Sequence, residues 1–305
     1  MRHVLTLAGC VLLAAPASAQ IVRASVSTAG MQANGPSSAP GMSANGRFIV
    51  FASDADNLVA SDTNGATDVF LHDRDSDGDG AFDEAGGIST TRLSVGPHGL
   101  AGSGPSTDPV ITPDGRYVCF VSRSDVLASF GTFGALQIYR LDRTAGTIIR
   151  VSVDDTGVAG DLDSTDPVIS DDGNVVAFAS LASTLVPGAA TPTSGIFVRE
   201  ITAGRTTRLS PPGPQSENAY YHPTISADGR FVLYQSSRVV RPLNLPTAQL
   251  FDRVTGVTHP LDATFPLYAQ LSTAGTHAFV RALEGLLRLP VDLPVGKALV
   301  LPNTD

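Results

Sequence analysis

The feature that most constrains the fold is an internal repeat built around a tight turn. Five copies begin at residues 43, 112, 170, 226 and 272 and read SANGRFIVFAS, TPDGRYVCFVS, SDDGNVVAFAS, SADGRFVLYQS and STAGTHAFVRA. Asn-Gly or Asp-Gly between apolar runs predicts a β-hairpin, because the two central residues of its turn need positive φ. The run after each turn mixes β-branched and aromatic residues, which is typical of a strand covered on both faces.

Two further strands are predicted after each of the first three hairpins. The third strands read DVFLHDR, QIYRLDR and GIFVREI, and the fourth strands read TTRLSV, IIRVSV and TTRLSP. Four short antiparallel strands that recur every roughly 40 to 60 residues indicate the blades of a β-propeller. The predicted fold class is therefore all-β. We count five blades, with six as the alternative, because the last copy is degenerate.

The segment Ile21–Ser27 resembles the fourth strands of the later repeats, but no blade precedes it. In a closed propeller such a strand completes the last blade and joins the two chain ends, which removes the exposed sheet edges of an open array. We therefore expect the N-terminal strand to close the ring.

The repeat also resembles a known family. The motif SxDGRxVxFxS, followed by a strand ending in Asp-Arg and then TTRLSV, is similar to the TolB-like (WD40-like) propeller repeats of exported bacterial proteins. The resemblance covers the chain from about Ile21 to about Val291. It implies a propeller platform, and in some members protein partners in the periplasm, and it implies no reaction.

The first nineteen residues have the organisation of a secretory signal peptide. Arg2 and His3 precede an apolar run from Val4 to Ala15, and Ala17-Ser18-Ala19 is a small-residue cleavage pattern. Cleavage after Ala19 would leave residues 20–305 as a single propeller domain, in the periplasm or the medium. The alternative is a lipoprotein attached through Cys10, although this Cys precedes most of the apolar run. No later apolar stretch is long enough to span a membrane.

Charge and cysteine content narrow the classes of partner. The formal net charge is −9, which argues against nucleic acid and anionic membranes as ligands. Cleavage would leave Cys119 as a single cysteine, so that no disulfide can form within the chain and burial alone must hold the fold. We expect a monomer that binds a protein or a cell-envelope ligand.

The acidic loop from Asp73 to Glu84, DRDSDGDGAFDE, is the most specific local motif. Alternating carboxylates on a curved loop supply the oxygen ligands that Ca²⁺ prefers. The preferred register resembles the DxDxDGxxD calcium hairpin, with ligands from Asp75, Asp77, Asp79, the Ala81 carbonyl and Asp83. An EF-hand register would use Asp73 and Glu84 instead, but the flanking segments read as strands. We expect one structural Ca²⁺.

A second set of polar residues occupies equivalent positions at the start of each blade's first strand, six residues before the turn. These strands should be innermost, so the set predicts a ring near one mouth of the central channel. Carboxylates and an imidazole there could hold a metal or a polar ligand. The polar members are Asp108, Asp166, His222 and Tyr268.

No motif for nucleophilic catalysis is present. The sequence has neither a G-x-S-x-G elbow nor HExxH, and Cys119 lies in the middle of a predicted strand. We therefore assign no catalytic residues and expect an exported binding or scaffold module. The alternative is a hydrolase or lyase that uses the polar residues at the channel mouth.

Overall fold

The computed structural model describes residues 21–305 except 129–133, 188–193, 212–217, 241–242, 262–265, 273–275, 283–284, 291–298 and 301–305. The described strands form five four-stranded antiparallel sheets, each in chain order or its reverse. The first sheet contains β1 (Ser37–Met42), β2 (Phe48–Ser53), β3 (Asp68–Asp73) and β4 (Ser89–Arg92), and the second contains β5 (Ser106–Ile111), β6 (Tyr117–Ser122), β7 (Gln137–Asp142) and β8 (Thr147–Arg150). The expected all-β propeller with four strands per blade is confirmed.

The remaining sheets repeat the same plan. The third contains β9 (Ser164–Ile169), β10 (Val175–Ser180), β11 (Gly195–Glu200) and β12 (Arg205–Arg208). The fourth contains β13 (Asn218–Ile225), β14 (Phe231–Val240), β15 (Leu243–Asp252) and β16 (Val257–Leu261), and the fifth contains β17 (Pro266–Leu271), β18 (His277–Ala282), β19 (Gly285–Pro290) and β20 (Leu299–Val300). A short 3-10 turn, η1 (Pro97–Gly99), is the one helical element in the described part of the chain.

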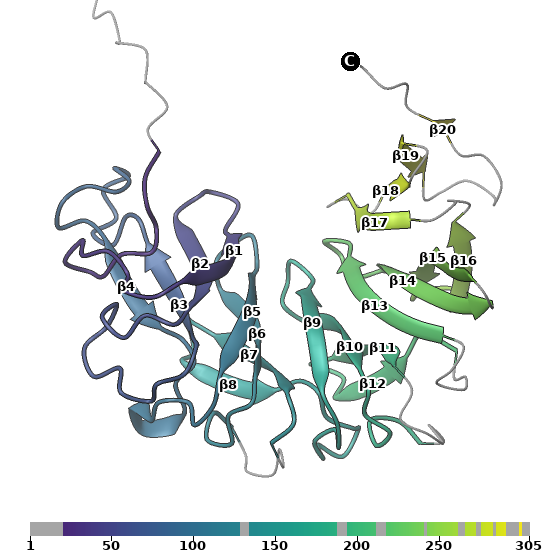
Figure 1. Ribbon diagram of the computed structural model, residues 1–305, viewed down its shortest axis with the longest axis horizontal. Coiled ribbons are helices and arrows are strands. Elements are labelled where there is room, and N and C mark those ends of the chain that lie inside the picture. The colour runs from purple at the N-terminus through teal and green to yellow at the C-terminus, as the bar shows by residue number, and fades with distance from the viewer. Residues whose placement is uncertain are drawn as a thin grey trace, which may run out of the picture.

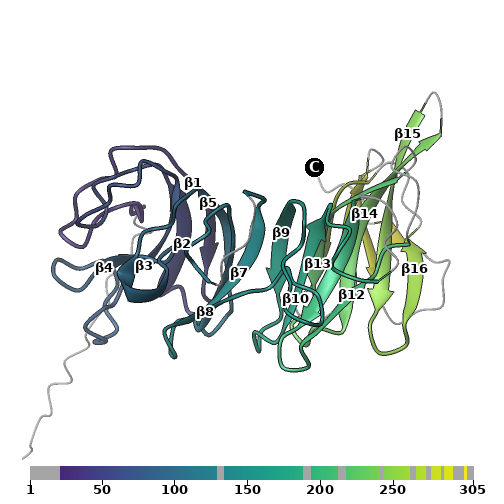
Figure 2. The same cartoon turned by 90° about the horizontal axis from the view of Figure 1, so that it is seen from below.

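The sheets follow one another along an open arc, with the first strand of each sheet on its concave side (Figure 1). Seen from below, they stack as successive layers in chain order (Figure 2). Extensive contacts between strands occur within a sheet or between consecutive sheets. The innermost position predicted for the first strands is therefore the position they occupy.

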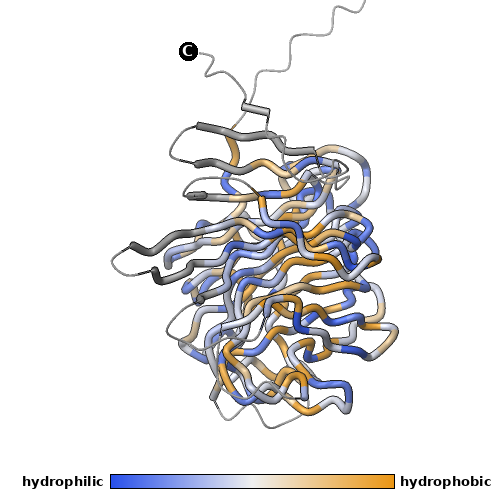
Figure 3. Tube along the Cα trace, turned by 90° about the vertical axis from the view of Figure 1, so that its right-hand side faces the viewer, coloured by the Kyte–Doolittle hydropathy of each residue, from blue (hydrophilic) through white to orange (hydrophobic). Residues whose placement is uncertain are grey.

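Apolar side chains between consecutive sheets form the core. One cluster joins Val50 and Leu71 of the first sheet to Phe120 and Tyr139 of the second, and three similar clusters join the later sheets. The strands β6 and β10 are buried on both faces because the central sheets have a neighbour on either side. In Figure 3 the apolar segments accordingly recur along the stacked strands.

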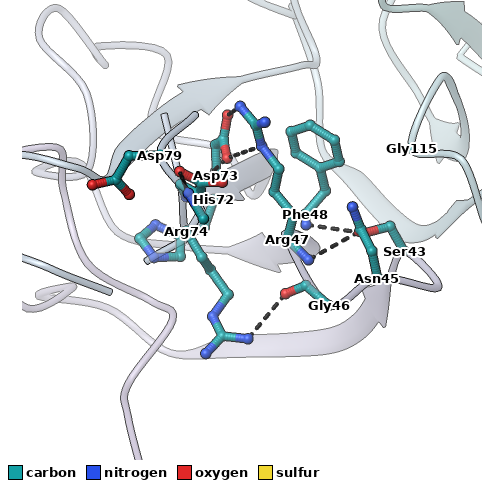
Figure 4. Close-up of polar contacts among 12 residues, drawn as sticks. Ser43, Asn45, Gly46, Arg47, Phe48, His72, Asp73, Arg74, Asp79 and Gly115 are labelled. Carbon is teal, nitrogen blue, oxygen red and sulfur yellow. Dashed lines mark hydrogen bonds and ion pairs between the residues drawn. The ribbon is translucent and has the colours of Figure 1, made fainter. Parts of the chain in front are cut away.

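The predicted turns have the local structure that their sequence demands. Gly46, Gly115, Gly173 and Gly229 all have φ between 71° and 75°. In the first turn, the hydroxyl of Ser43 donates to the Asn45 side chain at 2.8 Å and accepts from the Phe48 amide at 3.0 Å (Figure 4). The glycine of the fifth turn, Gly275, lies outside the described residues.

The structure does not show the expected closure of the ring. Among the described residues, the fourth place in the last sheet is held by β20, not by Ile21–Ser27. Val26 instead forms an isolated bridge with Gln32, and its carbonyl accepts a hydrogen bond from the Thr90 hydroxyl at 2.6 Å. The segment thus contacts the outer strand of the first sheet.

This contact follows from the repeat itself. Val153, which follows the second sheet, accepts an equivalent bond from Thr206 of the third sheet at 2.5 Å. The N-terminal segment therefore behaves as a linker that would follow a preceding blade. The predicted signal peptide and Cys10 lie outside the described residues, within which no helix is long and apolar enough to cross a membrane.

Candidate functional site

The acidic loop lies between β3 and β4, at the end of the first sheet. One carboxylate oxygen from each of Asp75, Asp77 and Asp79 lies within 4.8 Å of the other two. Asp75 is buried, whereas Asp77 and Asp79 are exposed. These three residues could hold one metal ion, because hard cations bind several carboxylate oxygens at a shared point.

Glycines and backbone amides shape this loop. Gly78 and Gly80 have φ of 77° and 90°, which side chains other than glycine rarely adopt. The Gly80 amide donates to Asp75 Oδ1 at 3.3 Å, and the Ala81 amide donates to Asp79 Oδ1 at 2.8 Å. The chain therefore curls around its own carboxylates and keeps them on the inner side of the loop.

Glu84 lies close enough to this cluster to be affected by it. The negative charge of Asp79, followed by that of Asp77, raises the pKa of Glu84 above its ordinary value. A nearby carboxylate whose ionisation is disfavoured by like charges is stabilised in its charged form by a cation. The loop thus offers a fourth carboxylate beside Asp75, Asp77 and Asp79.

Asp83 and Asp73 have arginine partners instead. Asp83 accepts hydrogen bonds from Arg74, whose Nε lies 3.0 Å from both of its carboxylate oxygens. Asp73 accepts two bonds from Arg47, at 2.8 and 2.9 Å (Figure 4). Although burial opposes the change, these bonds lower the pKa of Asp73. Each carboxylate is oriented by a guanidinium from outside the cluster of three.

His72 is a site residue that the sequence reasoning missed. Its side chain is buried next to the acidic loop, with 1% of its surface exposed, and this burial lowers the pKa of the imidazole. Its Nδ1 lies 3.0 Å from the Thr90 hydroxyl, and its Nε2 lies 4.0 Å from an Asp83 oxygen. Since the Thr90 hydroxyl donates to Val26, Nδ1 must be the donor in this pair. The repeat contained a signal for His72, because the equivalent residue of the second sheet is the apolar Leu141, so that a histidine departs from the pattern.

The second candidate set lies on the inner strands at a recurrent bulge. Asp108, Asp166 and His222 have φ between 50° and 54°, and Ala39 at the same position of the first sheet has φ of 49°. Each precedes a proline, and in each sheet this pair of residues faces a single residue of the next strand. A proline cannot donate to a β-ladder, so a bulge accommodates it without losing a regular bond.

The bulge brings two of the ring residues on neighbouring sheets together. His222 Nδ1 lies 3.9 Å from Asp166 Oδ2, and their side chains are 63% and 36% exposed. Asp108 is exposed on the second sheet. Tyr268 belongs to β17, but its side chain is not among those the structure describes. Left-handed backbone at a residue other than glycine is costly, and it often marks a functional position.

Cys119 is unsuited to nucleophilic chemistry. Its side chain is fully buried in β6, and this burial raises the pKa of the thiol to about 12. The reactive thiolate is therefore scarce at neutral pH. The residue packs as a small apolar side chain between the second and third sheets.

The successive four-stranded sheets define a β-propeller fold. No protein-family model and no curated protein sequence matches the chain. Among solved structures, TolB from Acinetobacter baumannii is 17% identical with a TM-score of 0.47, and the match covers 89% of this chain and 57% of that chain. The chain thus spans little more than half the length of that relative.

Two further solved structures support the same architecture. A putative TolB from Agrobacterium tumefaciens is 15% identical with a TM-score of 0.51, covering 86% of this chain and 73% of that one. The β-propeller domain of the Trilobed protease from Pyrococcus furiosus, which has an open velcro topology, is 8% identical with a TM-score of 0.51. That match covers 85% of this chain and 70% of the other. The chain therefore shares its fold with TolB proteins and with a protease domain.

Proposed function

We propose that this protein is an exported binding module whose propeller presents a surface to a protein or cell-envelope ligand. The acidic loop of the first blade binds one Ca²⁺ that fixes its conformation. The observation that carries the cation site is the convergence of Asp75, Asp77 and Asp79 within 4.8 Å. Export to the periplasm or the medium, and a monomeric state, are parts of the same proposal. Export rests on the signal-like N-terminal residues.

The cation is Ca²⁺ on chemical grounds. The side chains that meet in the loop offer carboxylate oxygens, which suit hard cations, and among the described residues no imidazole or thiolate joins the three. A loop that offers several carboxylates and a backbone carbonyl suits the six to eight oxygens of Ca²⁺ better than the rigid octahedron of Mg²⁺. Glu84 and the Ala81 carbonyl would complete the set. Asp83 would join only by giving up bonds from Arg74.

We expect isothermal titration to show one Ca²⁺ per chain, with Kd in the range of about 10⁻⁴ to 10⁻³ M that is typical of extracellular calcium modules. At a free Ca²⁺ concentration one hundred times Kd, the unfolding free energy should rise by about 2.7 kcal/mol. Asp77→Ala should lower the affinity at least tenfold, because it removes a central ligand. Absence of binding to the wild type at several millimolar Ca²⁺ would refute the site.

Matched variants identify the ligands. Asp56→Ala removes the same charge from an exposed position outside the loop and should leave the affinity unchanged. Glu84→Gln should weaken binding. Asp73→Asn should leave the Ca²⁺ affinity intact, because Arg47 already holds that carboxylate. A loss of affinity in Asp73→Asn would instead favour the EF-hand register.

A second candidate function is a ligand site, or a hydrolase or lyase centre, at the channel mouth. It is favoured by the left-handed bulges that bring His222 and Asp166 to 3.9 Å. An imidazole beside a carboxylate suits Zn²⁺, which serves as a probe. We expect calorimetry to show Zn²⁺ binding that weakens at least tenfold in His222→Ala. His259→Ala, on the outer strand β16, should bind as the wild type does. If His222→Ala and His259→Ala bind Zn²⁺ equally well, the polar residues at the channel mouth do not form the site.

A further inference from the structure

Two junctions between consecutive sheets share the same packing around a turn glycine. A Cβ added to Gly115 would lie 2.4 Å from the Phe48 ring of the first sheet. A Cβ added to Gly173 would lie 2.1 Å from the Tyr117 ring of the second sheet. Gly115 and Gly173 thus pack directly on a ring that opens the second strand of the preceding sheet, where no side chain could fit, whereas Gly229 of the fourth turn packs on Val175.

A guanidinium completes each of these junctions. Arg143 donates to the Gly115 carbonyl and lies 4.1 Å from the centre of the Phe48 ring. Arg140 donates to the Gly173 carbonyl and lies 4.4 Å from the centre of the Tyr117 ring. Cation–π attraction and a charge-assisted hydrogen bond therefore tie glycine, arginine and ring together.

No described sheet precedes the first sheet, yet its turn glycine takes part in a similar three-part contact. Arg74 donates to the Gly46 carbonyl at 2.9 Å (Figure 4) and lies 4.8 Å from the centre of the Phe82 ring. A Cβ on Gly46 would lie 3.8 Å from the Phe82 ring. Phe82 belongs to the acidic loop of the same sheet. Its ring faces Gly46 as the rings of Phe48 and Tyr117 face Gly115 and Gly173, but at a greater distance.

We infer that the acidic loop caps the first described sheet, in which Phe82 takes the place on Gly46 that an aromatic residue of a neighbouring blade takes at Gly115 and Gly173. An array of stacked units needs such a cap, because its terminal unit otherwise exposes the apolar face that its neighbour would cover. Arg74 links the cap to the turn and to Asp83. Among the described residues, the atoms nearest to a Cβ on Gly46 belong to Arg74, Phe82 and Met42 of the first sheet and its loop.

The cap also gives the proposed cation a role. Phe82 lies between Asp79 and Glu84 in the chain, so a cation held by these acids would restrain the ring on Gly46. This second step rests on the proposed Ca²⁺ site, whereas the cap itself rests on the contacts of Gly46, Arg74 and Phe82 alone.

Three matched glycine variants test the cap. Gly46, Gly115 and Gly173 have nearly equal φ, at 75°, 75° and 72°, so alanine strains the backbone equally in each. Because only Gly46 has room for a Cβ, Gly46→Ala should lower Tm by a few degrees. Gly115→Ala and Gly173→Ala should lower Tm at least twice as much or prevent folding. A loss in Gly46→Ala as large as in the other two would overturn the inference, since it would mean that another sheet packs on Gly46.

A fluorescent variant separates the cap from the cation. The chain contains no tryptophan, so Phe82→Trp provides a single indole. A seated indole should emit at shorter wavelength than free N-acetyltryptophanamide, and adding Arg74→Ala should remove that shift. Solvent-like emission with and without Ca²⁺ would overturn the cap. A shift that is the same in EDTA and in Ca²⁺ would support the cap and contradict only its control by the cation.

Discussion

Phe178→Ala is expected to lower the free energy of unfolding by about 3–5 kcal/mol. Phe178 lies in β10, is fully buried, and stacks on Phe197 with ring centres 6.0 Å apart. It packs in the cluster between the second and third sheets, and it is the single residue opposite the Asp166–Pro167 bulge. Removal of the ring would leave a cavity beneath the inner-strand position that carries Asp166.

Urea unfolding followed by circular dichroism measures this effect. Phe178→Leu keeps most of the apolar volume and should cost less than about 1.5 kcal/mol. If the bulge depends on the ring opposite, Phe178→Ala should also weaken Zn²⁺ binding at His222, whereas Phe178→Leu should weaken it less. An alanine variant within 1 kcal/mol of the wild type would show that this inter-sheet cluster does not limit stability.

The sheets could be predicted from the sequence because their signals are local. An Asp-Gly or Asn-Gly pair fixes a turn within four residues, and a serine or threonine three residues before the glycine caps it, as Ser43 does for Gly46. The fourfold strand pattern then follows from repetition. The inner-strand bulges were less visible, although each proline signals that a regular ladder cannot continue through it.

The acidic loop shows where such local reasoning ends. Spacing alone places Asp75, Asp77 and Asp79 on one side of a curved loop, and the structure brings them together. Spacing cannot show that Arg47, from the preceding turn, forms an ion pair with Asp73. It also cannot show that Arg74 turns towards Asp83 and Gly46 while Glu84 faces the acids. Competition among charged neighbours decides these contacts, and it depends on packing between strands.

Closure of the ring was predicted because Ile21–Ser27 is similar in sequence to the fourth strands. That similarity did not determine which sheet the segment contacts. Ile21–Ser27 resembles a fourth strand, yet Val26 also corresponds to Val153, which follows the fourth strand of the second sheet and bonds to Thr206 of the third sheet. The structure shows the second contact, through Val26 and Thr90. Phe82 at Gly46 supplies a physical reason for an open end, because the place that a closing blade would use is occupied.

Acid should destabilise the protein through two arginine–aspartate pairs, in the second and fourth sheets, that repeat the place of Arg47–Asp73 in the first sheet. Bonds from Arg116 lower the pKa of Asp142 to about 2, and bonds from Arg230 lower the pKa of Asp252 to about 2. A carboxyl group whose folded pKa is depressed stabilises the protein above its unfolded pKa, near 3.9. This contribution is lost as pH falls from about 4 to about 2.

Each pair should contribute about 1–2 kcal/mol, a range that allows for solvent screening of the half-exposed arginines. The unfolding free energy should therefore fall by about 2–4 kcal/mol between pH 5 and pH 2 from these pairs. The third sheet has Asn174 and Glu200 at the equivalent positions and supplies no such pair. The double variant Asp142→Asn/Asp252→Asn should be less stable than the wild type at pH 5, and the two should converge near pH 2 in urea titrations. Parallel curves for the two proteins from pH 5 to pH 2 would show that acid unfolds the propeller through other carboxylates.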